Sequence, residues 1–178
     1  VGTYNDGKQS IARGDSIING STIVAKQSNS NFISLAPSVN YSPYMANNLW
    51  LGNDGAMIDS AGFDIGITMN LQNFSGQTGS LAKVGNGTLT LTGSNGYSGG
   101  TTINGGSLKA NRNTLGTGAV VINDGGTLYA NDQWVLCGAN PYNVAERNIG
   151  TLTINAGGTL QFDATNGFAN GVTNLYLN

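Results

Sequence analysis

The sequence contains no histidine and a single cysteine, Cys137. Without histidine, imidazole-based acid–base catalysis and histidine-ligated zinc sites are excluded. One cysteine excludes an intramolecular disulfide and any cluster of thiolate ligands. For Cys137 itself, the role of a small buried side chain is favoured over an intermolecular disulfide.

Charged residues are also scarce, at 9% of the chain compared with roughly 25% in an average soluble domain. Seven Lys and Arg against nine Asp and Glu give a net charge of −2, so we expect no nucleic-acid partner. Long apolar runs are missing too, and we therefore expect no membrane insertion by this segment. Polarity comes instead from abundant Asn, Thr and Ser, beside 28 glycines.

One short sequence motif, called the phrase below, recurs in this polar sequence. It reads Ile-Asn, then a Gly-Gly pair, then Ser or Thr followed by Leu, at residues 103–108, 122–128 and 154–160. Apolar residues on both sides alternate with polar ones, which predicts two short strands joined at a glycine corner. The corner residues that carry this prediction are Asn104, Gly105, Gly106, Asn123, Gly125, Gly126, Asn155, Gly157 and Gly158.

The spacing of the phrase, roughly 20 to 30 residues, favours stacked coils over a series of hairpins. Ordering one coil costs about 1–2 kcal/mol per residue in backbone entropy, while four or five inward apolar side chains return only about 1.5–3 kcal/mol each. A coil must therefore stack on its neighbours, and we expect the corner asparagines to form an internal amide ladder. We expect the repeat region to cover residues 49–178, with residues 1–48 forming a less regular β segment continuous with it.

A family resemblance makes the predicted fold more specific. Residues 81–93 read Leu-Ala-Lys-Val-Gly-Asn-Gly-Thr-Leu-Thr-Leu-Thr-Gly, and residues 97–102 read Tyr-Ser-Gly-Gly-Thr-Thr. With their flanks, residues 56–108 resemble the autotransporter-associated β-strand repeat, also called the passenger-associated transport repeat. The resemblance implies an all-β, right-handed parallel β-helix (β-solenoid) that is exported from a bacterium and is extracellular or displayed at the cell surface. It implies neither a particular ligand nor a catalytic site.

The acidic residues give little support to an enzyme. β-Helix enzymes that act on uronate polymers need several carboxylates on one face, often with calcium. Here the nearest candidates are Asp54, Asp59 and Asp64, which are scattered singly and fit turn positions. We therefore expect no catalytic residue, no metal site and no cofactor.

These features predict a non-catalytic, structural or adhesive segment of an autotransporter-type protein. The alternative is a subunit of a self-assembling extracellular filament, because residues 174–178 still read as a strand that offers an edge for end-to-end association with another copy. A polysaccharide-active enzyme is the least favoured interpretation. Trp134 and Tyr142 are candidate contacts for cell-surface glycans, since aromatic rings present flat faces to sugars.

Overall fold

The computed structural model describes residues 16–34, 48–132, 135–136, 149–163 and 174–178. Within these residues the regular structure is entirely β, and the strands form three sheets. The described part of the chain contains no helix with the length and hydropathy to cross a membrane.

The strands of each sheet follow one another along the chain at intervals of about one coil. Sheet A contains β1 (Ser16–Ile18), β4 (Asn48–Leu51) and β7 (Asn70–Asn73). Sheet B contains β2 (Ser21–Val24), β5 (Ala56–Asp59), β8 (Leu81–Val84), β10 (Thr101–Ile103), β12 (Val120–Ile122), β14 (Thr151–Ile154) and β16 (Asn174–Leu177). Sheet C contains β3 (Asn29–Ile33), β6 (Ile65–Ile67), β9 (Thr88–Leu91), β11 (Gly106–Ala110), β13 (Gly126–Ala130) and β15 (Thr159–Phe162).

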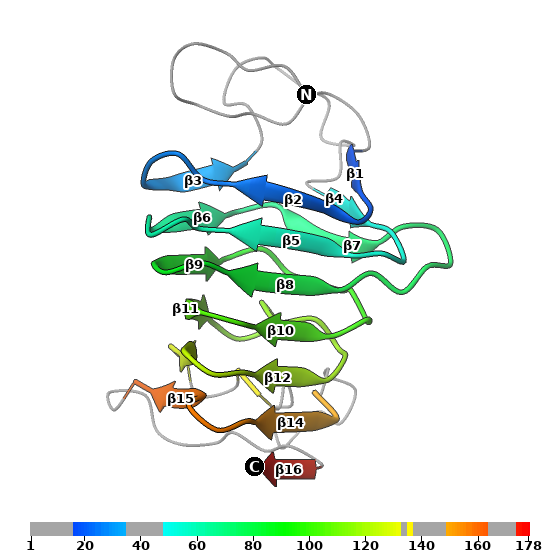
Figure 1. Cartoon of the computed structure of the whole chain (residues 1–178). Helices are drawn as coiled ribbons and strands as arrows, with labels where there is room; N and C mark the ends of the chain where they lie inside the picture. The colour runs from blue at the N-terminus through cyan, green and yellow to red at the C-terminus, as the bar shows by residue number, and fades with distance from the viewer. Residues whose placement is uncertain (1–15, 35–47, 133–134, 137–148, 164–173) are drawn as a thin grey trace.

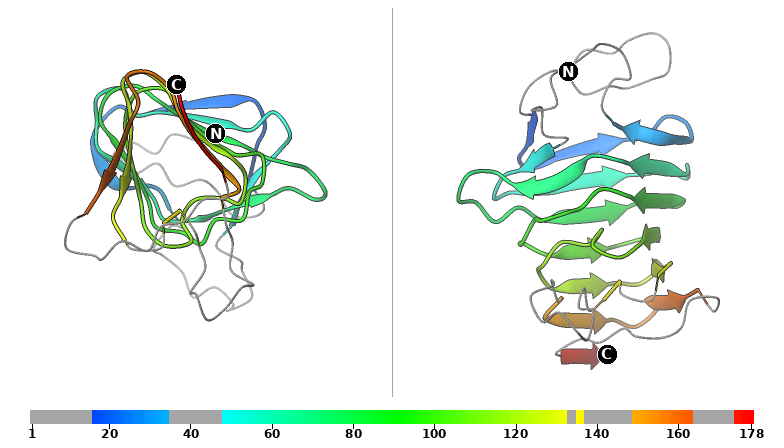
Figure 2. Two further views of the ribbon diagram at one scale, coloured as in Figure 1. Left: turned by 90° about the horizontal axis from the view of Figure 1, so that it is seen from below. Right: turned by 180° about the vertical axis from the view of Figure 1, so that it is seen from behind.

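Every described strand pairs in parallel with the equivalent strand of an adjacent coil. Figure 1 shows the coils stacked from the blue N-terminal strands at one end to the red β16 at the other. Seen end-on in Figure 2, the coils superpose around a common axis. The structure is therefore a parallel β-helix, and the predicted all-β solenoid is confirmed.

The number of residues per coil varies while the strand register is kept. In sheet B, Leu81 pairs with Ala56, Thr101 with Leu81 and Val120 with Thr101, so these coils take 25, 20 and 19 residues. The next step, from Val120 to Leu152, takes 32 residues. Such variation is tolerated because extra residues are placed in the connections between strands, where they do not disturb the paired rows.

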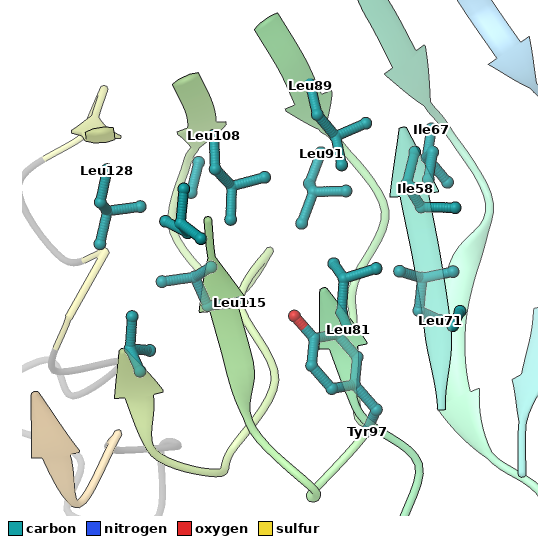
Figure 3. Packing of buried hydrophobic residues seen from close by; sticks show 14 of the residues in the cluster. Ile58, Ile67, Leu71, Leu81, Leu89, Leu91, Tyr97, Leu108, Leu115 and Leu128 are labelled. Atoms are coloured by element: carbon teal, nitrogen blue, oxygen red, sulfur yellow. The ribbon is translucent and has the colours of Figure 1, made fainter. Parts of the chain in front are cut away.

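Alternate residues of the strands point into one continuous core. In sheet C, the inward row Ile65, Leu89, Leu108 and Leu128 is stacked in register and fully buried. Figure 3 shows Leu89, Leu108 and Leu128 following one another along the interior, with Leu81 of sheet B and the ring of Tyr97 in the same core. Each such side chain stabilises the stack by about 1.5–3 kcal/mol, and only because neighbouring coils cover it.

Residues 16–33 form one further coil at the N-terminal end of the described stack. β1 pairs with β4, β2 with β5 and β3 with β6, all in parallel. The β3–β6 pair is irregular, because the register shifts between Asn29 and Ile33. Phe32 and Ile33 nevertheless join the core.

Candidate functional site

The corners between sheets B and C hold all the corner residues predicted from the sequence. At the corner of residues 123–126, the Gly126 N–H donates to the Asn123 carbonyl at 2.9 Å, and Gly125 has a φ of +70°. At residues 155–158, Gly158 donates to Asn155 at 2.8 Å, and Gly157 has a φ of +79°. Both corners are thus tight turns that close on themselves and use glycine for its left-handed backbone.

The corner of Asn104, Gly105 and Gly106 is different. Three residues separate the register-matched positions Ile103 and Ser107, whereas four separate Ile122 and Thr127. Instead of closing a turn, the Ser107 N–H donates to the Gly87 carbonyl of the preceding coil at 3.0 Å. This shorter corner therefore depends on the neighbouring coil for its hydrogen bonds.

An amide ladder links the asparagines that begin these corners. The Nδ2 group of Asn123 donates to Asn104 Oδ1 at 2.6 Å, Asn155 to Asn123 at 2.6 Å and Asn178 to Asn155 at 2.9 Å. The predicted ladder is confirmed, but it is not internal. Asn104 and Asn178 are exposed, and Asn123 and Asn155 are only half-buried, because these side chains follow the inward isoleucines and so turn outward.

A buried lysine lies beneath the corners, and sequence reasoning missed it. Lys83 has no solvent exposure, and it occupies the inward row of sheet B between Ile58 and Ile103. Its Nζ donates to the carbonyl oxygens of Val84 at 3.0 Å, Gly85 at 2.6 Å and Gly105 at 3.0 Å. The available signal was the alternation of residues 81–84, which places Lys83 on the same face as Leu81.

Ser60 extends this polar group to the preceding coil. It is fully buried, and its Oγ donates to the Asn86 carbonyl at 2.6 Å. We call the side chains of Lys83 and Ser60, with the carbonyl groups of Val84, Gly85, Asn86 and Gly105, the Lys83 cluster. It joins three consecutive coils from the inside.

The environment changes the ionisation of Lys83. Burial lowers the pKa of Lys83 from its usual 10.5 to about 8, because the charged ammonium loses its hydration, and attraction to Asp59 offsets part of this effect. The carbonyl oxygens supply partial negative charge that stabilises the ammonium. The cluster is enclosed, so it is suited to hold coils together rather than to meet a substrate.

Tyr97 forms a second buried polar contact. It has no exposure, and its hydroxyl group shares a 2.6 Å hydrogen bond with Thr101 Oγ1. Burial raises the pKa of Tyr97 to about 12, while its hydrogen bonds with Thr101 and Gly116 act in the opposite direction. Thr101 stands in the inward row between Leu81 and Val120, so this contact also satisfies a polar group inside the core.

Two of the three candidate acidic side chains, those of Asp59 and Asp64, accept hydrogen bonds from backbone N–H groups. Asp59 Oδ1 accepts from the Ala61 N–H at 2.8 Å, and Asp64 Oδ1 accepts from the Thr88 N–H of the next coil at 2.9 Å. The Asp54 N–H donates to Asn19 Oδ1 at 2.8 Å. Over the described ranges, no group of three or more His, Cys, Asp or Glu residues is placed to hold a metal ion.

Three residues considered from the sequence lie outside the described residues: Trp134, Tyr142 and Cys137. On the described surface of sheet C, a hydroxyl row of Thr88, Ser107, Thr127 and Thr159 runs along the stack. Beside this row, the Lys109 ammonium lies 5.3 Å from the centre of the Tyr129 ring, a cation–π contact between adjacent coils.

The sequence around Lys83 is similar to a known repeat. Residues 81–110 match the family model of the passenger-associated transport repeat. The match covers Lys83, Tyr97 and the short corner at Gly105, so the hydrogen bonds of Lys83 and the contact between Tyr97 and Thr101 lie within the matched residues. No curated protein and no solved structure matches the chain.

The passenger-associated transport repeat indicates which class of protein contains this segment. It is a structural repeat of autotransporter passengers and not a catalytic family. Its presence indicates a passenger-associated segment of an exported protein, either secreted or at the surface.

Proposed function

We propose that this chain is a structural segment of an autotransporter passenger, a β-helix stalk that holds other parts of the passenger away from the cell. The observation that supports it is continuity along the axis. The inward row of sheet B runs from Ile23 through Ile58, Lys83, Ile103 and Ile122 to Ile154 without a break in pairing. Each coil adds about 4.8 Å of length along the axis, so the length of the stack increases with the number of coils.

A displayed spacer tests the proposal. The chain is placed between a surface anchor and a fluorescent head, and energy transfer from the head to a membrane dye reports its height above the membrane. We expect the height to increase relative to a fusion that lacks the chain. The matched control carries Leu108→Asp, which buries a charge in the core and collapses the stack. Equal heights for the native and the control chain would contradict a spacer role.

A non-catalytic role is tested separately. The purified chain is incubated with neutral and uronate-rich polysaccharides, with and without calcium, and the reducing ends are measured. No release is expected. Cleavage that is lost with Asp59→Asn would make the chain an enzyme and overturn the proposal.

The second candidate function is that of a filament subunit. It is supported by the exposed apolar side chains of β16, the last described strand of the stack. Among the described strands, β16 pairs with β14 alone, and its Leu175 and Leu177 are 53% and 71% exposed. Unpaired strand edges with apolar side chains favour addition of another strand. The test is sedimentation of the chain over a concentration series, with Leu177→Lys as the variant. Growth of the native chain alone would support the filament, and a concentration-independent monomer would exclude it.

An adhesive contribution is proposed for Trp134 and Tyr142 as glycan contacts. The support is chemical, because aromatic faces bind sugars and the surrounding sequence has little charge. Glycan-array binding of the native chain, lost in Trp134→Ala and Tyr142→Ala and kept in Tyr129→Ala, is the expected result. Binding that survives both substitutions would exclude this site.

A further inference from the structure

The inward row of sheet B contains one residue that does not match its neighbours. Ile58 precedes Lys83 in the row and Ile103 follows it, with Ile122 and Ile154 beyond. Burying an ammonium in such a row is unfavourable unless its three hydrogens find acceptors. An isoleucine at this position would avoid that problem, so the presence of a lysine calls for a physical reason.

The coils that follow Lys83 are nearly interchangeable in their apolar residues. Leu108 and Leu128 occupy the same inward position, as do Ala110 and Ala130. A stack in which one coil is skipped would therefore bury similar side chains. Apolar packing alone discriminates poorly between such registers, a known hazard of repeated strands.

The corners of these coils do differ. The corner of residues 123–126 closes its own turn by donating to the Asn123 carbonyl, and that of residues 155–158 does the same at Asn155. The corner that begins at Asn104 is one residue shorter, and its Gly105 carbonyl accepts the third hydrogen bond of Lys83 at 3.0 Å. The two corners are also close, since a Cβ on Gly105 would lie 3.8 Å from the backbone of Gly85.

We infer that Lys83 acts as a register key, a residue that selects which coil stacks next to its own. Its ammonium is satisfied when the short corner of Gly105 lies directly over the corner of Gly85. A four-residue corner uses the carbonyl of its first residue to close its own turn, and we expect such a corner in that place to leave one hydrogen of the buried ammonium unpaired. Buried polar groups have this use in coiled coils, where one polar core residue sets the register. The inference does not depend on the proposed stalk function.

Disulfide trapping tests the key. In a Cys137→Ser background, Ala82→Cys is combined with Thr102→Cys, its native partner on the outward side of the next coil. In a second variant of the same background, Ala82→Cys is combined with Val121→Cys, which lies one coil further away. Adjacent strands are about 4.8 Å apart, within disulfide reach, whereas two coils are about 10 Å apart, beyond the limit of about 7 Å.

With Lys83 present, the first pair should crosslink and the second should not. With Lys83→Met, which keeps an apolar side chain of similar length, we expect the first crosslink to decrease and the second to appear. Lys109→Met is the control, because it removes a lysine from the outward face of β11. Full retention of the first crosslink in Lys83→Met, with none of the second, would overturn the inference.

A change in the partner corner gives the same test with Lys83 intact. An Asp inserted between Asn104 and Gly105 copies the corner of residues 123–126. We expect this insertion to decrease the first crosslink and to produce the second, as Lys83→Met does. Insertion of the same residue after Ser75, at an exposed turn, is the control and should leave the native crosslink. If both the lysine variant and the corner insertion lose all β circular dichroism, the inference is also overturned, because the cluster would then be needed for folding itself and not for choosing between registers.

Discussion

Lys83 and Tyr97 are the residues whose chemistry is changed most by the fold. Both are fully buried, and both find hydrogen-bond partners inside the coil, Lys83 among carbonyl groups and Tyr97 at Thr101. Their pKa values move in opposite directions, because burial disfavours the charged form of each group. The two residues should therefore shape the dependence of stability on alkaline pH.

Lys83 should make the protein more stable as the pH rises from about 8 to 10.5. Its folded-state pKa is about 8, against its usual 10.5. In this interval the unfolded chain binds more protons than the folded one, so the free energy of unfolding increases, by about 3 kcal/mol at most. Urea denaturation at several pH values measures the slope. Lys83→Met should abolish this increase of the free energy of unfolding with pH, and Lys109→Met should keep it. If the increase survives in Lys83→Met, another titrating group causes it.

Tyr97 should have the opposite effect at higher pH. Its folded-state pKa is raised to about 12 from 10.0. Its contribution is fully present below pH 10 and is lost as the pH rises towards 12, because the unfolded chain releases the proton first. Tyr97→Phe should flatten this decline and lower stability at neutral pH by about 1 kcal/mol for the lost hydrogen bond. Tyr129→Phe, on the outer face of sheet C, is the control; identical pH profiles for both variants would argue against a role of Tyr97.

The corners decide how each coil connects its strands, at the scale of the element. The predicted asparagines and glycines all lie at corners, but their roles differ in ways that the repeated phrase did not reveal. Two corners close their own turns, and the third takes its hydrogen bonds from neighbouring coils. One missing residue causes this difference, and its effect is visible only when the coils are stacked.

Each asparagine of the amide ladder should stabilise the folded protein in proportion to the number of ladder hydrogen bonds that it makes. Asn123 donates to Asn104 and accepts from Asn155, whereas Asn104 stands at the end of the ladder and accepts one bond from Asn123. At about 0.5–1.5 kcal/mol for each hydrogen bond, Asn123→Ala should destabilise about twice as much as Asn104→Ala. Urea denaturation compares them. Equal losses would show that the ladder bonds add little to stability.

Glycine substitutions should separate backbone strain from steric conflict. Gly125 has a φ of +70° and open space where a Cβ would lie, so Gly125→Ala should cost about 1 kcal/mol for the left-handed backbone. Gly87 has a φ of +96°, and a Cβ there would lie 2.4 Å from the Phe63 carbonyl oxygen. Gly87→Ala should therefore destabilise by several times more in thermal unfolding. Similar losses for the two variants would mean that the coils can move apart to accept a methyl group.

Stability at the scale of the whole molecule comes from contacts between neighbouring coils. β11 pairs with β9 on one side and β13 on the other, whereas β16 has one partner among the described strands, β14. In such one-dimensional stacks, each coil is stabilised by the coils on its two sides. The described chain should accordingly be most stable in its centre.

Hydrogen exchange should show this gradient. Amides of β9, β11 and β13 should exchange more slowly than those of β16, because opening the central strands requires breaking two interfaces. Mass spectrometry of exchanged peptides measures the difference. Equal protection of β16 and β11 would indicate that β16 is covered by another molecule, and dilution would then restore fast exchange.

The stacked coils follow from the sequence alone, because a phrase that cannot bury its own apolar side chains must share a core with its copies. The corner glycines and the amide ladder follow as well, since they depend on local backbone geometry and on repetition. The place of Lys83 depends on the tertiary structure, because a lysine is ordinarily solvated and becomes acceptable in a core only where carbonyl groups from two corners converge on it. That convergence joins residues 22 positions apart in the chain, and only the register of the stacked coils brings them together.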